Sequence, residues 1–297
     1  MDALNISQAA LAGYDWGGRA ACIVAALWPQ RVKCLASQGG YNIQDISGSQ
    51  EPRAPEMEYR AWYQYYFLAE RGRKGLEKNR REFCRLLWRL WSPNWHFDDE
   101  TYERSAKSFD NPDFVDVVIH SYRHRFGLVW GDPAVQDTED RLAARPQISV
   151  PTIALDGGTS GVRGSRHPGG RSHFFTGKYE HHEIPLAGHN LPQEAPREFA
   201  DSTLSLVSIW LALVASASAS GDRPLLRRQR QIFARFRRLV SGQPSGGCEL
   251  SDPIDREVCQ ARQYRTKIVA NRDFYNSDGT ALPPRLLRVG CCQCLLQ

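Results

Sequence analysis

A short apolar run that enters a helical pattern through a glycine-rich turn is the feature that most constrains the fold. Residues 9–13 read AALAG, residues 13–18 read GYDWGG, and a helical pattern covers residues 19–28 before Pro29. Further short apolar runs at residues 32–37, 150–155 and 179–185 predict three more strands, with a helix from about residue 193 onward. Strands that alternate with helices predict an α/β fold with a parallel, doubly wound sheet.

A long segment rich in Trp, Tyr and Arg, residues 41–148, separates the second and third predicted strands. Residues 70–90 carry Leu76, Phe83, Leu86, Leu87 and Leu90 at helical spacing, and Pro93 closes the pattern. Ligands of such folds bind at the carboxyl edge of the sheet. We therefore predict a helical lid inserted between strands, over that edge.

The turn has the form G-x-D-x-G-G, which is the nucleophile-elbow arrangement with Asp15 in the place that serine usually holds. Glycines at positions 13, 17 and 18 suit a strained turn whose helix packs close to its strand. The turn would expose the Asp15 carboxylate and aim the backbone N–H of Trp16 at a developing oxyanion. An aspartate that only caps the following helix is the alternative.

A histidine follows the last predicted strand, in the segment LAGHNLP at residues 186–192. The chain order of this kind of fold is nucleophile, acid, histidine, so His189 stands where the base is expected. A carboxylate nucleophile forms an alkyl-enzyme ester, which a base-activated water then hydrolyses. Asp15 and His189 are therefore the predicted catalytic pair.

Residues 1–205 resemble the α/β-hydrolase superfamily, in the branch of epoxide hydrolases and haloalkane or haloacetate dehalogenases. The resemblance rests on GYDWGGRAA, WYQYYFLAERG, FDNPDFVDVVIHSYRHR and GKYEHHEIPLAGHNLPQEAP. It implies two lid tyrosines that hydrogen-bond the epoxide oxygen, Tyr66 and Tyr122, with Tyr63 or Tyr65 as alternatives to Tyr66. In dehalogenases a tryptophan at the place of Trp16 donates its indole N–H to the leaving halide.

The sequence departs from the family pattern at two places. The triad acid is expected where Ser160 stands, and Asp156 at the end of the third strand is the nearest carboxylate. The resemblance also implies several strands ahead of residue 1, so we expect an N-terminally truncated domain with a partial sheet. Unpaired strand edges would favour self-association.

Charge and cysteine usage divide the chain into residues 1–215, the partial hydrolase domain, and residues 216–297, a tail of unknown fold. Residues 221–297 hold 14 Lys and Arg against 7 Asp and Glu, whereas residues 1–220 hold 24 against 26. Cys22, Cys34 and Cys84 are predicted to be reduced packing residues. Five further cysteines lie in the tail and lack the spacing of a zinc site. A solvated amphipathic helix explains the arginines at residues 227–238 without a nucleic-acid partner.

The sequence thus predicts a hydrolase that resembles epoxide hydrolases and acts on a small epoxide or halogenated compound without cofactor or metal. A dehalogenase and a truncated, non-catalytic remnant are the alternatives. The apolar run at residues 203–219 is shorter than a bilayer span and is predicted to be a buried helix rather than a membrane anchor. A cytoplasmic location is expected.

Overall fold

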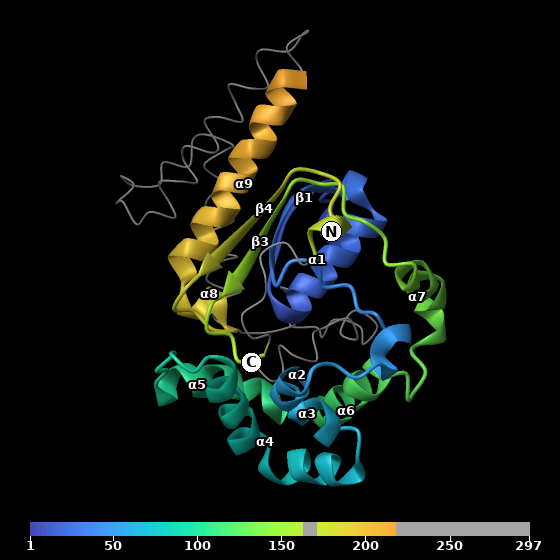
Figure 1. Ribbon diagram of the computed structural model, residues 1–297, viewed down its shortest axis with the longest axis vertical. Helices are drawn as coiled ribbons and strands as arrows, with labels where there is room; N and C mark the ends of the chain where they lie inside the picture. The colour runs from blue at the N-terminus through green and yellow to red at the C-terminus, as the bar shows by residue number, and fades with distance from the viewer. Residues whose placement is uncertain (163–170, 218–297) are drawn as a thin grey trace, which may run out of the picture. The chain divides into compact units, whose positions relative to one another are not determined.

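The computed structural model describes residues 1–162 and 171–217, and the predicted alternation of strands and helices is confirmed there (Figure 1). The four predicted strands are confirmed within two residues at either end: β1 (Ala9–Gly13), β2 (Val32–Gln38), β3 (Thr152–Gly157) and β4 (Tyr179–Ile184). They form one sheet in chain order, β1-β2-β3-β4, and every neighbouring pair is parallel. The predictions for residues 218–297, including the arginine-rich helix and the five tail cysteines, lie outside the described residues.

Helices cover both faces of this sheet, as the doubly wound pattern requires. Helix α1 (Asp15–Leu27) connects β1 to β2, while α8 (Leu191–Glu194) and α9 (Pro196–Ala217) follow β4. Successive side chains of a strand point to opposite faces. Leu35 of β2 accordingly packs in one cluster with residues of α1, whereas its neighbours Cys34 and Ala36 pack in another with residues of α9.

Six helices form the predicted insertion between β2 and β3. They are α2 (Pro55–Arg60), α3 (Trp62–Tyr66), α4 (Glu70–Trp91), α5 (Asp99–Ala106), α6 (Phe114–Arg125) and α7 (Gln136–Ala143). Helices α2 to α6 gather at the end of the sheet towards which β3 and β4 point (Figure 1). Short 3₁₀ turns occupy Asp2–Leu4, Pro29–Arg31, Ser47–Gln50, Lys107–Asp110, Pro133–Val135 and Ser172–Phe174.

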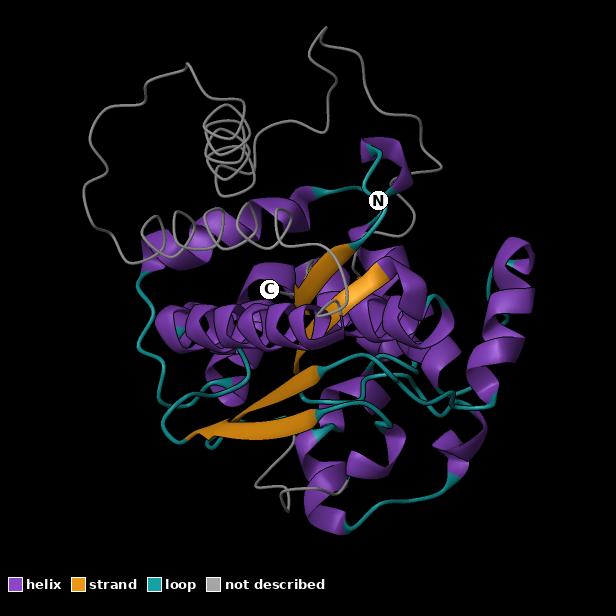
Figure 2. Cartoon of the chain, turned by 90° about the horizontal axis from the view of Figure 1, so that it is seen from above, coloured by secondary structure: helices purple, strands orange, loops and turns teal. Residues whose placement is uncertain are grey.

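Figure 2 shows from above that helices lie on either side of the strands. An aromatic core holds the helices of the insertion together. Trp88, Trp91, Tyr63, Phe67 and Tyr122 are all at most 2% exposed and belong to one cluster. Each buried side chain of this size contributes roughly 1.5–3 kcal/mol relative to an exposed one. The tryptophans and tyrosines that make this segment unusual in composition are thus its packing core.

The three isolated cysteines are confirmed as buried and free of disulfides. Cys84 lies in the aromatic core of the insertion, and Cys22 and Cys34 lie on opposite faces of the sheet. Among the described residues, no helix is long and apolar enough to cross a membrane.

The turn between β1 and α1 has the strained conformation that its sequence predicts. Asp15 has a φ of 46°, a backbone conformation that residues other than glycine rarely adopt. A Cβ at Gly13 would lie 2.5 Å from the backbone of Gly17, so position 13 requires glycine. A Cβ at Gly17 would meet no described atom within 4 Å, so packing gives no reason for glycine there.

This contrast predicts opposite effects for two matched substitutions. Gly13→Ala should lower the free energy of unfolding by about 1–3 kcal/mol, because the new methyl group overlaps the backbone of α1. Gly17→Ala should raise it by up to about 1 kcal/mol, because alanine loses less conformational entropy in a helix. Urea unfolding followed by tryptophan fluorescence measures both values. Equal destabilisation by the two variants would contradict the close approach at Gly13.

Candidate active site

Asp15 lies at the start of α1, at the carboxyl end of β1. Its side chain is buried, with 5% of the residue exposed. The first backbone N–H groups of a helix carry partial positive charge, which favours a carboxylate at this place. The strained φ and the helix end together hold one oxygen-bearing side chain above the sheet.

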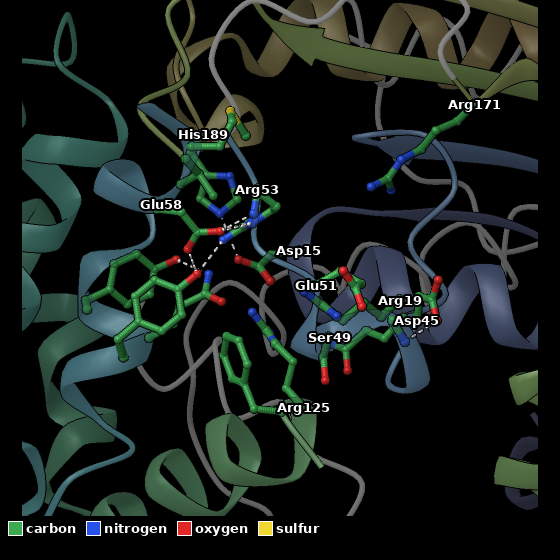
Figure 3. A pocket seen from close by; sticks show the side chains of 18 residues that line it. Asp15, Arg19, Asp45, Ser49, Glu51, Arg53, Glu58, Arg125, Arg171 and His189 are labelled. Carbon is green, nitrogen blue, oxygen red and sulfur yellow. Dashed lines mark hydrogen bonds and ion pairs between the residues drawn. The ribbon is translucent and has the colours of Figure 1, made fainter. Parts of the chain in front are cut away.

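His189 lies in the loop that joins β4 to α8 and is also buried, with 2% exposed. Its Nε2 is 2.7 Å from Oδ2 of Asp15, although the two residues are 174 positions apart in the chain. Figure 3 shows Asp15 between the His189 ring and the Arg125 side chain. The two predicted catalytic residues therefore meet in one buried hydrogen bond.

The charge state of Asp15 results from opposing effects. Burial alone would raise the pKa of its carboxyl group, because a low-dielectric environment disfavours the charged form. The hydrogen bond to His189 and the charges of His189, Arg19 and Arg125 outweigh this effect and lower the pKa of Asp15 below its usual value. Asp15 is therefore ionised at neutral pH, as a nucleophile must be.

A pocket of about 270 Å³ opens beside this pair (Figure 3). Its lining combines charged, amide and aromatic side chains: Asp15, Arg19, Gln44, Asp45, Gly48, Ser49, Glu51, Arg53, Met57, Glu58, Tyr63, Gln64, Tyr65, Arg125, Phe126, Val162, Arg171 and His189. A volume of this order fits a small organic molecule. The residues come from α1, the loop after β2, the insertion helices and the two loops after β3 and β4.

Two arginines near Asp15 were not found by the sequence reasoning. Arg19 lies one helical turn after Asp15 on α1, and Arg125 lies at the end of α6. With its amide oxygen turned towards them, Gln44 accepts hydrogen bonds from Arg125 Nε at 2.8 Å and from Arg19. The spacing of four residues from Asp15 was the sequence signal for Arg19.

The structure places the predicted lid tyrosines in different surroundings. Tyr66 is not among the residues that line the pocket, because its ring stacks on Phe83 and its hydroxyl lies against Gly75. Tyr65 lines the pocket, but its hydroxyl contacts Glu58 and Arg53. Tyr63, which the sequence left as an alternative, lines the pocket beside Asp15 and His189.

Tyr122 lies next to Tyr63, with ring centroids 5.8 Å apart in an edge-to-face arrangement. Burial raises the pKa of both phenols, and the negative charge of Asp15 contributes in the same direction. Both hydroxyls therefore keep their protons at neutral pH. The Tyr122 hydroxyl is buried without a hydrogen-bond partner among the described residues.

Two other predicted site residues have different partners from those expected. Asp156 accepts from His181, with Oδ2 2.9 Å from Nε2 of that ring, and so does not serve His189. The Trp16 ring lies against the guanidinium of Arg19, 5.0 Å from the ring centroid, and Trp16 does not line the pocket. The geometry around the indole therefore does not support a halide contact.

Ser160, at the expected position of the triad acid, does lie beside the histidine loop. The backbone N–H groups of Gly161 and His189 both donate to the carbonyl of Trp91, each at 3.0 Å. Yet neither the buried Ser160 hydroxyl nor Nδ1 of His189 has a hydrogen-bond partner among the described residues. The serine thus occupies the place of the acid without orienting the imidazole. The same part of the chain contains no group of three side chains that could hold a metal ion.

Comparison with known proteins identifies the family of the chain. Residues 1–196 match the model of the alpha/beta hydrolase fold family, and the chain belongs to that family. A putative epoxide hydrolase from Klebsiella pneumoniae is 46% identical, with 69% of this chain and 68% of that chain covered and a TM-score of 0.67. Within the family, the chain is thus similar to an epoxide hydrolase-like protein.

More distant structures share the fold. A putative epoxide hydrolase from Pseudomonas aeruginosa is 19% identical over 71% of this chain and 69% of that chain, with a TM-score of 0.56. A putative acyltransferase from Salmonella enterica is 20% identical over 70% and 66%, with a TM-score of 0.58. No curated protein matched the sequence.

Proposed function

We propose that this α/β hydrolase opens small epoxides to diols through an ester on Asp15. The observation that carries the proposal is the buried Asp15–His189 hydrogen bond in a pocket that Tyr63 also lines. An ionised carboxylate is the nucleophile, and the protonated phenols of Tyr63 and Tyr122 supply the acid. The 46% identical putative epoxide hydrolase supports the same reaction class.

In the first step, an oxygen of Asp15 attacks an epoxide carbon and forms the ester bond. The carbon–oxygen bond of the ring breaks, and its electron pair stays on the epoxide oxygen, which takes a proton from a phenol. Tyr63 is the first candidate for this donor because it lines the pocket, with Tyr122 packed against it. General-acid assistance of this kind contributes about 10²–10⁴-fold.

In the second step, His189 accepts a proton from water, and the resulting hydroxide attacks the ester carbonyl carbon. The tetrahedral intermediate collapses with cleavage of the bond to the alkyl oxygen, which takes the proton from His189 and leaves as the diol. The remaining carboxyl proton restores the phenol. This step is slow in the proposed enzyme, because none of the described carboxylates binds Nδ1 of His189 to orient the imidazole and stabilise its charged form.

The covalent intermediate gives the most direct test. Incubation with styrene oxide should add the mass of the epoxide to the peptide that contains Asp15, and the adduct should accumulate in His189→Ala because hydrolysis is blocked. Mass spectrometry of the digested protein locates it. Asp15→Asn is the matched control, because the amide keeps the shape and lacks the nucleophile. A folded sample without an adduct would favour the non-catalytic reading.

Ser160→Asp tests whether the missing acid limits ester hydrolysis. The new carboxylate would stand beside the histidine loop, where Nδ1 of His189 has no partner among the described residues. If it binds Nδ1, hydrolysis of the ester should accelerate by up to about 10⁴-fold. Ser160→Asn is the matched control, since it has nearly the same shape and no charge. Release of diol after a single alkylation measures the step. Equal rates in the two variants would show that a carboxylate at position 160 is not what the site lacks.

Dehalogenation of a haloacid is the second candidate, and a specific feature favours it. Arg19 and Arg125 lie close enough to Asp15 to lower its pKa. Two guanidinium groups beside the nucleophile could hold the carboxylate of a haloacetate. The chemistry at Asp15 would be the same, but the leaving halide needs no proton.

The phenols separate the two reactions. Tyr63→Phe and Tyr122→Phe keep the rings and remove the proton donors, so the rate of Asp15 alkylation by an epoxide should fall about 10²–10⁴-fold in at least one variant. Alkylation by chloroacetate should change little. Single-turnover kinetics with both substrates measures this. Tyr66→Phe is the matched control, because the Tyr66 hydroxyl lies against Gly75 of the insertion and its ring stacks on Phe83. Equal losses with both substrates would remove the phenols from the mechanism.

A further inference from the structure

The loop that carries His189 is held by three consecutive backbone N–H groups. The N–H of Gly188 donates to Oε2 of Glu194 at 2.7 Å, and that of His189 donates to the Trp91 carbonyl at 3.0 Å. The N–H of Asn190 donates to Oγ of Ser92 at 3.0 Å. Two of these three acceptors, Trp91 and Ser92, are the last residue of the insertion helix α4 and the residue after it.

Ser92 and Glu194 also bind each other. The Ser92 hydroxyl donates to Oε1 of Glu194 at 2.6 Å while it accepts from Asn190. The Glu194 carboxylate thus accepts one hydrogen bond from the insertion and one from the histidine loop. Hydrogen bonds to an ionised acceptor are stronger than neutral ones, so this carboxylate is suited to fix both segments.

Close backbone approach makes the arrangement possible. A Cβ on Gly188 would lie 2.5 Å from Cα of Ser92, and a Cβ on Gly161 would lie 1.7 Å from the carbonyl oxygen of Leu90. Only glycine allows the end of α4 to come so near to these two loops. The His189 ring also packs edge-on against Trp91, with centroids 5.3 Å apart.

The imidazole has little else to orient it. Nδ1 of His189 is buried without a partner among the described residues, where a triad would supply a carboxylate. Only Nε2 is hydrogen-bonded, and it faces the nucleophile. Apart from the hydrogen bond to Asp15, the direction of the ring therefore depends on the backbone of residues 188–190 and on the packing of the ring against Trp91.

We propose that Ser92 and Glu194 are positioning residues for His189, which together connect the end of the insertion helix α4 to the base that hydrolyses the Asp15 ester. Neither side chain lines the pocket, so they act through the histidine loop and not on the substrate. The expected effect on ester hydrolysis rests on the proposed function. The expected effect on the orientation of His189 towards Asp15 does not.

The effect on the orientation of His189 is tested first, without any substrate. In protein labelled with ¹⁵N-histidine, the Nε2 signal of His189 reports its hydrogen bond to Asp15, and Asp15→Asn provides the signal of the broken bond. Glu194→Gln and Ser92→Ala should move the wild-type signal towards that reference. Glu198→Gln and Ser108→Ala are the matched controls: Glu198 is exposed in the first turn of α9, and the Ser108 hydroxyl donates within the insertion to the Ser105 carbonyl.

The effect on ester hydrolysis is then tested by comparing two steps of one reaction. Hydrolysis of the Asp15 ester should slow by about 10²-fold in Glu194→Gln and in Ser92→Ala, the scale expected for a displaced catalytic group. The rate of Asp15 alkylation should change little, because the nucleophile is held by α1. The double variant should lose little more than either single variant, because the two residues act through one shared hydrogen bond.

The outcomes separate the two proposals. An unchanged His189 signal in both variants overturns the positioning role, whatever the activity. Equal slowing of alkylation and hydrolysis also overturns it, since a general loss of structure would produce that result. If the wild-type chain forms no ester at all, the proposed function fails, and the His189 signal alone decides the positioning role. Thermal unfolding of each variant identifies any that do not fold, and the conservative Glu194→Gln change provides the test if Ser92→Ala is among them.

Discussion

The hydrogen bond between Asp15 and His189 is the interaction on which the rest of the site depends. It joins the first residue of α1 to the loop after the last strand of the sheet, both buried. An unpaired buried carboxylate would be costly, so the pair requires that both segments be held at hydrogen-bonding distance. The positive φ of Asp15 and the glycine at position 13 provide this on one side, and the end of α4 provides it on the other.

Electrostatics then determine what the pair can do. The charges of His189, Arg19 and Arg125 overcome the burial of Asp15 and leave it ionised, while the same burial keeps the phenols of Tyr63 and Tyr122 protonated. One pocket thus contains an ionised carboxylate and the neutral phenol of Tyr63, with Tyr122 packed behind it, which is the combination that the proposed ring opening needs.

An incomplete triad changes how the base must be held. A carboxylate at the position of Ser160 would orient the imidazole directly through Nδ1. With serine there, the orientation depends on backbone hydrogen bonds to Trp91, Ser92 and Glu194, which are indirect. Under the proposed mechanism, ester formation needs Asp15 and an acid, whereas ester hydrolysis needs an imidazole that can carry charge, so the absence of a described acid at Nδ1 affects the second step more.

Local sequence by itself determined the four strands, the elbow at Asp15, the long helix at residues 70–91 and the place of His189. The strands and the helix depend on the periodicity of apolar residues, and the elbow depends on its glycines, all of which are local features of the sequence. The place of His189 follows from the order of the motifs along the chain. Only the tertiary structure decided which tyrosines line the pocket and which of their hydroxyls already have partners. Three of these tyrosines share one short helix, α3, but each has a different partner on another helix. Tyr63 packs against Tyr122, the Tyr65 hydroxyl contacts Glu58, and Tyr66 stacks on Phe83. Contacts between distant segments also decided the surroundings of Asp156, because His181 of the neighbouring strand binds its carboxylate. The surroundings of Arg125, Ser92 and Glu194 likewise depend on segments that lie far apart in the sequence.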